Sequence, residues 1–265
     1  MEKLVLFDLD GTLIESMKFD ADCYVEAVRR VLSISAVDTD WSHYHNVTDA
    51  GILAEIYRMN FRREIGRAPA RKVRETFVRI IQARLQSEKI KLKPLRGAGE
   101  ALRFLQASDR WAVALATGGW RESAEVKLGN AGLATGDLPI FSAHDSISRP
   151  GILKVAVQAM LKNEKIKRFK KIVYVGDGVW DVWAAREMQV GFVGVGTGRR
   201  TSSEPILPRQ RVLTSSGVRS RTTVSVRCSV IRIFPSTTLA SMNSVVTTGL
   251  KLPVRQPDFR QLEFW

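Results

Sequence analysis

The amino-acid sequence predicts an α/β fold: a Rossmann-like, doubly wound parallel sheet with a helical domain inserted after its first strand. The apolar runs of the sequence are short and lack polar alternation, which is typical of strands covered on both faces. Helical stretches separate these runs, and an alternation of strand and helix favours a parallel sheet. About 80 residues after the first run show helical periodicity alone, which predicts a separate small bundle.

The expected strands and helices of the core follow from these runs in order. The first strand, Val5–Phe7, ends directly in acidic and glycine residues. The later strands are expected at Trp111–Ala116, Leu138–Ser142, Ile172–Val175 and Gly191–Val195. Helices are expected over Gly99–Gln106 and Ile152–Leu161, because each keeps an apolar face. Residues 1–14 and 94–198 are thereby assigned to the core.

The inserted segment, residues 15–93, is predicted to form a helical cap. Its three apolar faces begin at Tyr24, Ile52 and Val73, and Thr48 is a candidate N-cap for the second helix.

Residues 199–265 differ in composition from the rest of the chain. The net charge is +14, and this segment holds ten Arg and one Lys against three acids, a net charge of +8. Eighteen of its 67 residues are Ser or Thr, and only Val224–Val230 alternates as one strand would. The remainder is predicted to be irregular or disordered. Two hypotheses are an insertion or misread frame in the gene, and a basic arm for nucleic acid, which the lack of interleaved aromatic residues disfavours.

Composition also limits the class of protein. No apolar run approaches the roughly 20 residues that a membrane-spanning helix needs. The run Leu4–Phe7 is too short for the core of a signal peptide, so a cytoplasmic protein is expected. Cys23 and Cys228 lie far apart without metal-ligand spacing and are given no role.

Acidic residues follow two of the expected strands. Asp8 and Asp10, two residues apart, end the first strand and project to the same side. Asp177 and Asp181 follow the strand Ile172–Val175 and fit one face of a turn that opens into a helix. Ligands bind at this end of the strands in open α/β sheets, and clustered carboxylates need a cation. Oxygen ligands make Mg²⁺ the natural choice, with Asp8, Asp10, Asp177 and Asp181 as candidates.

A third motif, Thr117-Gly118-Gly119, follows the strand Trp111–Ala116. A hydroxyl and glycines at the start of a helix present hydrogen-bond donors to a phosphate. Thr117 and Gly118 are therefore candidate substrate-binding residues.

In their order and strand contexts these motifs resemble the haloacid dehalogenase superfamily, in particular its phosphoglycolate phosphatase-like members, and the helical insert resembles that superfamily's C1-type cap. The resemblance implies that Asp8 is a nucleophile that forms an aspartyl-phosphate and binds Mg²⁺. It implies that Asp10 is the general acid and base, with its backbone carbonyl on the metal. It further implies that Thr117 holds the phosphate, that Asp177 binds the metal, and that Asp181 binds it or orients its waters. An acid at position 10 is typical of phosphatases and phosphomutases in the superfamily.

The superfamily's third motif supplies a cation, and here two residues compete for that role. Arg149 stands before Pro150, as the motif's cation usually does, whereas Lys154 lies one turn into the helix that follows. Lys154 is narrowly preferred as a compact charge on a helix facing the core. In the cap loop, His45 and Thr48 are expected to contact the leaving group, although Thr48 could equally serve only as a helix cap.

The sequence therefore predicts a Mg²⁺-dependent phosphatase for a small phosphorylated metabolite, with phosphoglycolate and sugar phosphates as the substrates that the resemblance implies. A phosphomutase acting through the same residues is the nearest alternative. A non-catalytic interaction or nucleic-acid-binding protein that uses the basic segment is the alternative of another class. No membrane partner is expected, and the sequence leaves the oligomeric state open.

Overall fold

The computed structural model describes residues 1–133, 135–196 and 229–231, and six parallel strands form one sheet in this part of the chain. The strands lie in the order β3-β2-β1-β4-β5-β6. Their bounds are Lys3–Phe7 (β1), Trp111–Ala116 (β2), Ile140–Phe141 (β3), Lys171–Gly176 (β4), Gly191–Val195 (β5) and Ser229–Ile231 (β6). The predicted Rossmann-like α/β class is confirmed.

Each of the five apolar runs contains a strand, but the run Leu138–Ser142 yields only two strand residues. Turns on both sides explain the difference: the Leu138 amide donates to the Thr135 carbonyl, and the Asp145 side chain accepts from the Ser142 amide. The strand β6 overlaps the end of the alternating stretch Val224–Val230. The other predictions for residues 199–265 lie outside the described residues.

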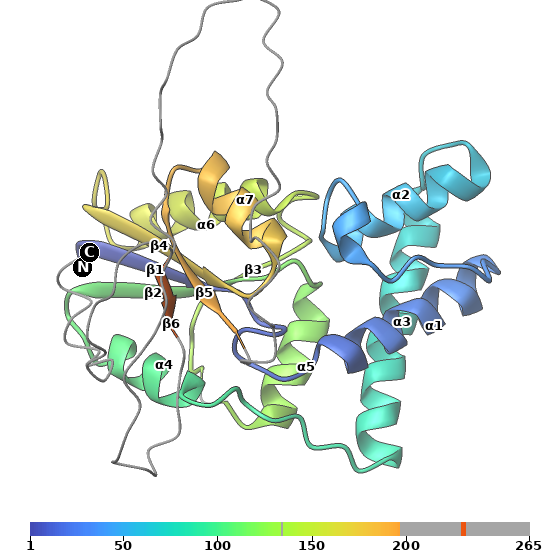
Figure 1. Ribbon diagram of the computed structural model, residues 1–265, viewed down its shortest axis with the longest axis horizontal. Helices are drawn as coiled ribbons and strands as arrows, with labels where there is room; N and C mark the ends of the chain where they lie inside the picture. The colour runs from blue at the N-terminus through green and yellow to red at the C-terminus, as the bar shows by residue number, and fades with distance from the viewer. Residues whose placement is uncertain (134, 197–228, 232–265) are drawn as a thin grey trace, which may run out of the picture.

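Helices cover both faces of the sheet (Figure 1). The helices α4 (Ala98–Gln106) and α5 (Arg121–Ala131) lie on one face, and α6 (Arg149–Asn163) and α7 (Val179–Glu187) on the other. Alternate residues of β1 separate accordingly, because successive side chains of a strand point to opposite faces. Leu4 and Leu6 belong to the apolar cluster under α6 and α7, whereas Val5 and Phe7 belong to the cluster under α4 and α5.

The remaining helices lie beside the sheet, on the right in Figure 1. They are α1 (Met17–Leu32), the 3₁₀ turn η1 (Trp41–His43), α2 (Asp49–Phe61) and α3 (Arg67–Ser87). The chain enters and leaves this group at one place, where the Glu15 amide donates to the Lys93 carbonyl at 2.9 Å and the Leu95 amide to the Leu13 carbonyl at 2.8 Å. The chain passes between the sheet and this helical group at these two crossings, and we call the helical group the cap.

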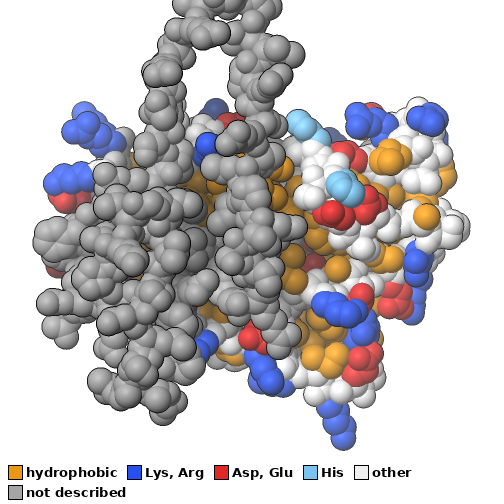
Figure 2. Space-filling model, in the orientation of Figure 1, with side chains coloured by type: hydrophobic (Ala, Val, Ile, Leu, Met, Phe, Trp, Pro, Cys, Tyr) orange, Lys and Arg blue, Asp and Glu red, His pale blue; other side chains and the backbone are white. Residues whose placement is uncertain are grey.

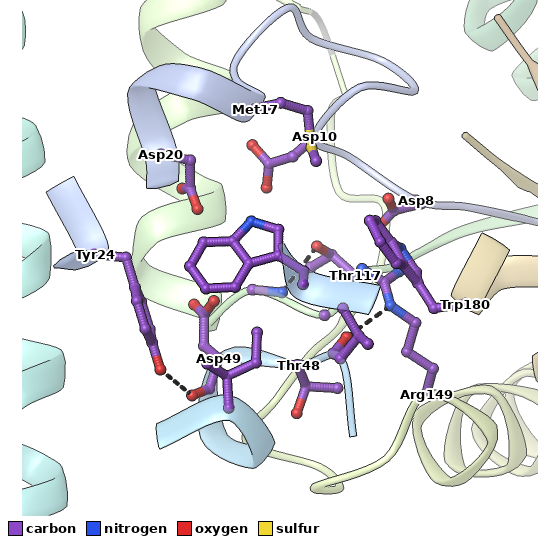
Figure 3. Close-up of a pocket in the computed structure, with 15 residues that line it drawn as sticks. Asp8, Asp10, Met17, Asp20, Tyr24, Thr48, Asp49, Thr117, Arg149 and Trp180 are labelled. Atoms are coloured by element: carbon purple, nitrogen blue, oxygen red, sulfur yellow. Dashed lines mark hydrogen bonds and ion pairs between the residues drawn. The ribbon is translucent and has the colours of Figure 1, made fainter. Parts of the chain in front are cut away.

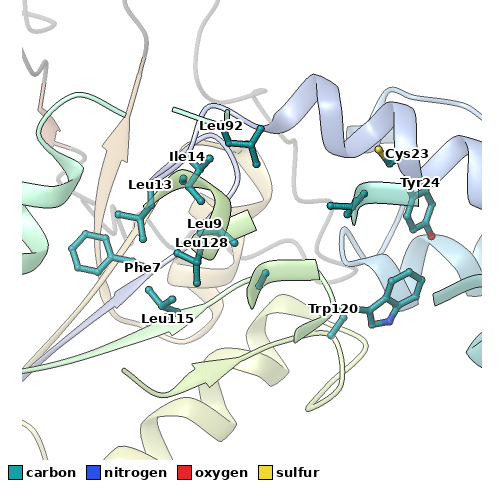
Figure 4. Packing of buried hydrophobic residues seen from close by; sticks show 14 of the residues in the cluster. Phe7, Leu9, Leu13, Ile14, Cys23, Tyr24, Leu92, Leu115, Trp120 and Leu128 are labelled. Atoms are coloured by element: carbon teal, nitrogen blue, oxygen red, sulfur yellow. The ribbon is translucent and has the colours of Figure 1, made fainter. Parts of the chain in front are cut away.

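One apolar cluster runs from the sheet into this helical group (Figure 4). Phe7, Leu115 and Leu128 fill its sheet end. At its other end Trp120, which follows β2, stacks on Tyr24 of α1 with ring centroids 5.8 Å apart. On the face drawn in Figure 2, hydrophobic side chains likewise gather where the sheet and the helical group meet. The cap is therefore packed against the loop after β2, next to the carboxyl ends of the strands.

Among the described residues, no helix combines the length and the apolar character that a membrane span requires. Cys23 is buried in the cap as a free thiol, and Cys228 lies outside the described residues.

Candidate active site

A pocket with about 540 Å³ of empty space, including its open mouth, lies between the strand ends and the cap. The core contributes Asp8 and Asp10 after β1, the loop that begins with Thr117 after β2, and Arg149 at the start of α6. The cap contributes residues of α1, η1 and α2. In Figure 3, Asp8, Arg149 and Trp180 lie on one side of this pocket, and Asp20, Tyr24 and Asp49 on the other. The pocket thus joins residues from both parts of the chain.

On the core side, Asp8, Asp177, Asp181 and Arg149 form what we call the strand-end cluster. One carboxylate oxygen from each of the three acids lies within 4.8 Å of the other two. Asp8 is buried and Asp177 partly so, and the Oδ1 atom of each is buried without a hydrogen-bond partner. Gly11 permits this approach, because it has φ +79° and a Cβ there would stand 2.3 Å from Asp177 Oδ2. The two unpartnered oxygens fit a bound cation.

Arg149 is the cation of the strand-end cluster. Its Nη1 lies 2.7 Å from Asp181 Oδ1 and 3.1 Å from Asp8 Oδ1, although the latter contact lacks hydrogen-bond geometry. Its Nε donates to the Val47 carbonyl of the cap loop at 2.9 Å. Lys154 is exposed on α6 and lies outside the pocket, so its position favours Arg149 over Lys154, against the preference drawn from the sequence. The physical reason is position: Arg149 begins α6 at the strand ends, whereas Lys154 has turned toward solvent.

Burial raises the pKa of two acids of this cluster, Asp8 and Asp177. Burial raises the pKa of Asp8 to about 7, with Arg149 opposing the shift and Asp181 and Asp10 adding to it. Burial, together with the charges of Asp8 and Asp181, raises the pKa of Asp177 to about 8. Several carboxylates sharing one desolvated site explain both shifts, and a divalent cation would reverse them.

Asp181 differs from the other two acids because its oxygens already have partners. Its Oδ1 accepts from Arg149 and, at 2.8 Å, from the Tyr174 hydroxyl, and its Oδ2 accepts from the Gly178 amide at 2.9 Å. It is also fully buried. This arrangement suits a residue that orients Arg149, whereas Asp8 and Asp177 each keep an oxygen that accepts no hydrogen bond.

Thr117 and Gly118, the candidate substrate-binding residues, line the pocket beside Arg149. The Thr117 Oγ1 accepts from the Gly119 amide at 3.1 Å, so its own proton remains for a ligand. At Gly118 a Cβ would stand 2.7 Å from Arg149 Nη2 and 2.9 Å from the Val47 carbonyl, so only glycine fits. A hydroxyl and a guanidinium edge therefore face the same space, near Asp8.

Asp10, Asp20, Asp49 and Lys127 form a second group, which we call the cap-side cluster. Lys127, on α5, is fully buried, and its Nζ lies 2.7 and 2.6 Å from the two carboxylate oxygens of Asp10 and 2.5 Å from Asp20 Oδ1. The Ser16 hydroxyl also donates to Asp10. Burial lowers the pKa of Lys127, but the charges of Asp10 and Asp20 outweigh it and raise the pKa overall. The Asp10 carboxylate is thus held away from the strand-end cluster.

Asp49, the first residue of α2, completes the cap-side cluster. Its Oδ2 accepts from the Trp120 amide at 2.8 Å. Burial, followed by the charge of Asp20, raises its pKa well above the ordinary value. Burial likewise raises the pKa of Asp20 to about 6, although Lys127 opposes the shift.

The two candidates in the cap loop are placed differently from the prediction. His45 is exposed and lies outside the pocket. Thr48 lines the pocket, but its hydroxyl accepts from the Gly51 amide at 3.0 Å and donates to the Ile147 carbonyl at 2.7 Å. His45 is thus placed away from an expected leaving group, and Thr48 occupies the alternative role of a helix cap, in which it also ties the cap to the core.

A family model for haloacid dehalogenase-like hydrolases matches residues 2–189. The chain belongs to this family. The predicted resemblance and the prediction of an enzyme are therefore confirmed, and the chain is a hydrolase with the family's fold.

Solved structures of similar fold include three from bacteria. A hydrolase from Pseudomonas syringae is 24% identical, with TM-score 0.55, and the match covers 73% of this chain and 84% of that one. CbbY from Rhodobacter sphaeroides in complex with phosphate is 15% identical, with TM-score 0.52 and coverage of 78% and 91%. A predicted phosphoglycolate phosphatase from Haemophilus somnus is 17% identical, with TM-score 0.50 and coverage of 72% and 84%. No curated protein sequence matches.

Sequence reasoning missed three residues of this hydrolase's pocket region: Asp20, Asp49 and Lys127. Each lies in a helix that also carries exposed charged residues, so its charge alone did not predict its burial. One signal was available for Lys127: it lies on the same buried face of α5 as Ala124, Leu128 and Ala131. Such a lysine requires acidic partners, which only the folded chain identifies.

Proposed function

We propose that this hydrolase is a Mg²⁺-dependent phosphatase that cleaves a small phosphomonoester through an aspartyl-phosphate on Asp8. The observation that carries the proposal is the environment of Asp8. Its carboxylate is buried at the end of β1, has an oxygen that accepts no hydrogen bond, and lies beside the guanidinium of Arg149 and the acids Asp177 and Asp181. A buried carboxylate facing an open pocket suits a nucleophile for phosphoryl transfer.

The residues present fit a divalent cation. Asp8 and Asp177 would hold it through their unpartnered oxygens, with the backbone carbonyl of Asp10 as the superfamily resemblance implies. Asp181 would orient Arg149 instead, because its oxygens are already engaged. Mg²⁺ matches an all-oxygen donor set, and when bound it would offset the negative charges of carboxylate and phosphate.

The phosphate would bind between Thr117 and Arg149. The Thr117 hydroxyl has a proton to donate, and Arg149 Nη2 has no hydrogen-bond partner among the described residues. Together they present a hydroxyl and a cationic donor to two phosphate oxygens. The guanidinium is already held in place, because its Nε donates to the Val47 carbonyl and its Nη1 donates to Asp181. Little reorganisation is therefore needed when the substrate binds.

In the first step a carboxylate oxygen of Asp8 forms a bond to phosphorus, and the bond from phosphorus to the leaving oxygen breaks. Asp10 supplies the proton that the leaving alcohol needs. Water then attacks phosphorus, its proton passes to Asp10, and the bond from Asp8 to phosphorus breaks to release phosphate. To reach the leaving oxygen, Asp10 must give up part of its contact with Lys127 and Ser16. These two residues therefore influence how readily Asp10 can transfer the proton.

The test is hydrolysis of p-nitrophenyl phosphate by the full chain, with Mg²⁺ and with a chelator. We expect Mg²⁺-dependent phosphate release that falls at least about 10³-fold in Asp8→Asn. Asp109→Asn is the matched control, since Asp109 is exposed just before β2, at the opposite end of the sheet from the pocket. Phosphate release also separates a phosphatase from a phosphomutase, which returns the group to its sugar.

Two outcomes would contradict the proposal. One is full activity in Asp8→Asn, which would place the nucleophile elsewhere. The other is a folded wild-type protein that releases no phosphate in the presence of Mg²⁺.

A further inference from the structure

The side of the pocket away from Asp8 is built largely by the cap, and the leaving group must lie there. Asp20 and Tyr24 come from α1 and Asp49 from α2, and Figure 3 shows them across the pocket from Asp8 and Arg149. A phosphate held by Arg149 and Thr117 would direct its ester oxygen toward this side. The chemistry of the cap-side cluster therefore selects the leaving group.

This side of the pocket is acidic. Asp10, Asp20 and Asp49 all line it, and their side chains are buried or nearly so. Among the described residues that line the pocket, Arg149 is the only Lys or Arg, and it is bound to the acids at the opposite side. The leaving group therefore faces carboxylates on this side of the pocket, and no Lys or Arg among the described lining residues lies beside them.

Lys127 cannot serve as that cation. Its ammonium has three N–H donors, and its three hydrogen bonds go to the two oxygens of Asp10 and to Asp20. Its side chain is also completely buried. One positive charge shared by two carboxylates leaves a net negative charge, to which Asp49 adds whenever it is ionised.

The same side offers acceptors, while its hydroxyl donors are already used. The Tyr24 hydroxyl donates to the Asp49 carbonyl at 2.7 Å, and the Thr48 hydroxyl donates to the Ile147 carbonyl. The Asp49 carboxylate accepts one hydrogen bond, from the Trp120 amide, whereas a carboxylate has room for about four. A ligand that brings its own donors would satisfy this surface.

We propose that the hydrolase acts on phosphomonoesters whose leaving alcohol carries no second negative charge and presents hydroxyl or ammonium donors to Asp49 and Asp20. This inference rests on the proposed phosphatase function and narrows its substrate class. Trp41 and Tyr24, which also line the pocket, suit the carbon skeleton of such an alcohol, and their ring faces also attract an ammonium group. Of the substrate types implied by the sequence, a neutral sugar-like phosphate is favoured over phosphoglycolate.

Three phosphomonoesters of nearly equal size test this charge selection. Their leaving alcohols are glycolate, ethylene glycol and ethanolamine, so 2-phosphoglycolate, 2-hydroxyethyl phosphate and O-phosphoethanolamine differ mainly in a carboxylate, a hydroxyl or an ammonium group. We expect kcat/KM for 2-phosphoglycolate to be at least about tenfold below that for the better of the other two. p-Nitrophenyl phosphate is assayed in parallel, to report the phosphatase chemistry independently.

The variant Asp49→Asn tests which residue imposes the selection. It keeps the size of the side chain and removes its charge. In an assay at a pH above the raised pKa of Asp49, the ratio of kcat/KM for 2-phosphoglycolate to that for 2-hydroxyethyl phosphate should therefore rise at least about threefold. A ratio between substrates cancels any general loss of active enzyme. A selective loss with O-phosphoethanolamine would identify an ammonium group as the preferred donor, and a selective loss with 2-hydroxyethyl phosphate would identify a hydroxyl group.

The outcomes separate this inference from the proposed function. If p-nitrophenyl phosphate is cleaved and 2-phosphoglycolate is the best of the three, or none of the three is cleaved, the charge selection is wrong and the phosphatase stands. If the ratio is unchanged in both Asp49→Asn and Asp20→Asn, the acidic side does not select the leaving group. If no substrate is cleaved, the proposed function fails and this inference fails with it.

Discussion

The strand-end cluster and the cap-side cluster each contain three acids and one cation that are buried or partly buried, yet they differ in how their charges are satisfied. In the cap-side cluster Lys127 uses all three donors on Asp10 and Asp20. In the strand-end cluster Arg149 and Tyr174 satisfy Asp181, while Asp8 and Asp177 each keep a buried oxygen without a hydrogen bond. Unsatisfied oxygens indicate where a ligand belongs, and satisfied ones indicate what the fold has fixed.

The comparison predicts that Lys127 is mainly a structural cation. Replacing it in Lys127→Met leaves Asp10 and Asp20 buried without a counter-charge, so the free energy of unfolding should fall by about 3–5 kcal/mol. Urea denaturation measures this change. Asp20→Asn is the control, because it leaves Lys127 paired with Asp10 and should cost much less. A Lys127→Met protein as stable as wild type would show that the cap-side cluster is not held together by its charges.

Arg149 is expected to be the functional cation, in contrast. Arg149→Met should lower kcat/KM for p-nitrophenyl phosphate by about 10²–10³, because a preorganised donor to the phosphate is lost. Lys154→Met should leave the rate unchanged, since that side chain is exposed outside the pocket. Steady-state rates of the two variants decide between them, and the reverse pattern would restore Lys154 as the motif's cation.

Metal binding should be coupled to pH through the strand-end cluster. The pKa of Asp8 is raised to about 7 and that of Asp177 to about 8, from ordinary values of 3.8. Between about pH 4 and pH 8 the folded chain therefore binds more protons than the unfolded chain, so without metal its stability falls as the pH rises.

Mg²⁺ would replace these protons, so it should raise the melting temperature more at pH 8 than at pH 5. At about 100 times its Kd, Mg²⁺ contributes roughly 2.7 kcal/mol, or about 5–10 °C. Thermal unfolding with and without Mg²⁺ at the two pH values measures the effect. Asp177→Asn should reduce it, and an equal shift at both pH values would contradict the assignment.

The smallest effects are expected in the loop that carries Asp49. Thr48→Ala removes the N-cap of α2 and the bond to Ile147, and should cost about 1 kcal/mol of unfolding free energy. Thr48→Ser keeps both bonds and should stay close to wild type. His45→Ala should change stability by less than about 0.5 kcal/mol and leave the rate unchanged, because His45 is exposed. A large rate loss in His45→Ala would return that residue to the leaving-group site.

The sequence by itself determined the fold and the core of the site. Apolar runs without intervening polar residues identified β1, β2, β4 and β5, because strands buried on both faces require apolar side chains throughout. Since parallel strands end at one edge of the sheet, the acids after β1 and β4 and the threonine after β2 had to lie close together. The sequence pattern was therefore sufficient to bring Asp8, Asp177, Asp181 and Thr117 to one edge of the sheet.

Only the tertiary structure decided the remainder. Arg149 and Lys154 share one helix, and which of them reaches Asp8 depends on how α6 is placed over the sheet. Lys127 and Asp20 are 107 residues apart in the sequence and meet only because α1 of the cap packs near α5. These contacts depend on packing between distant segments, and a local pattern cannot distinguish a charge that will be buried from one that stays in water.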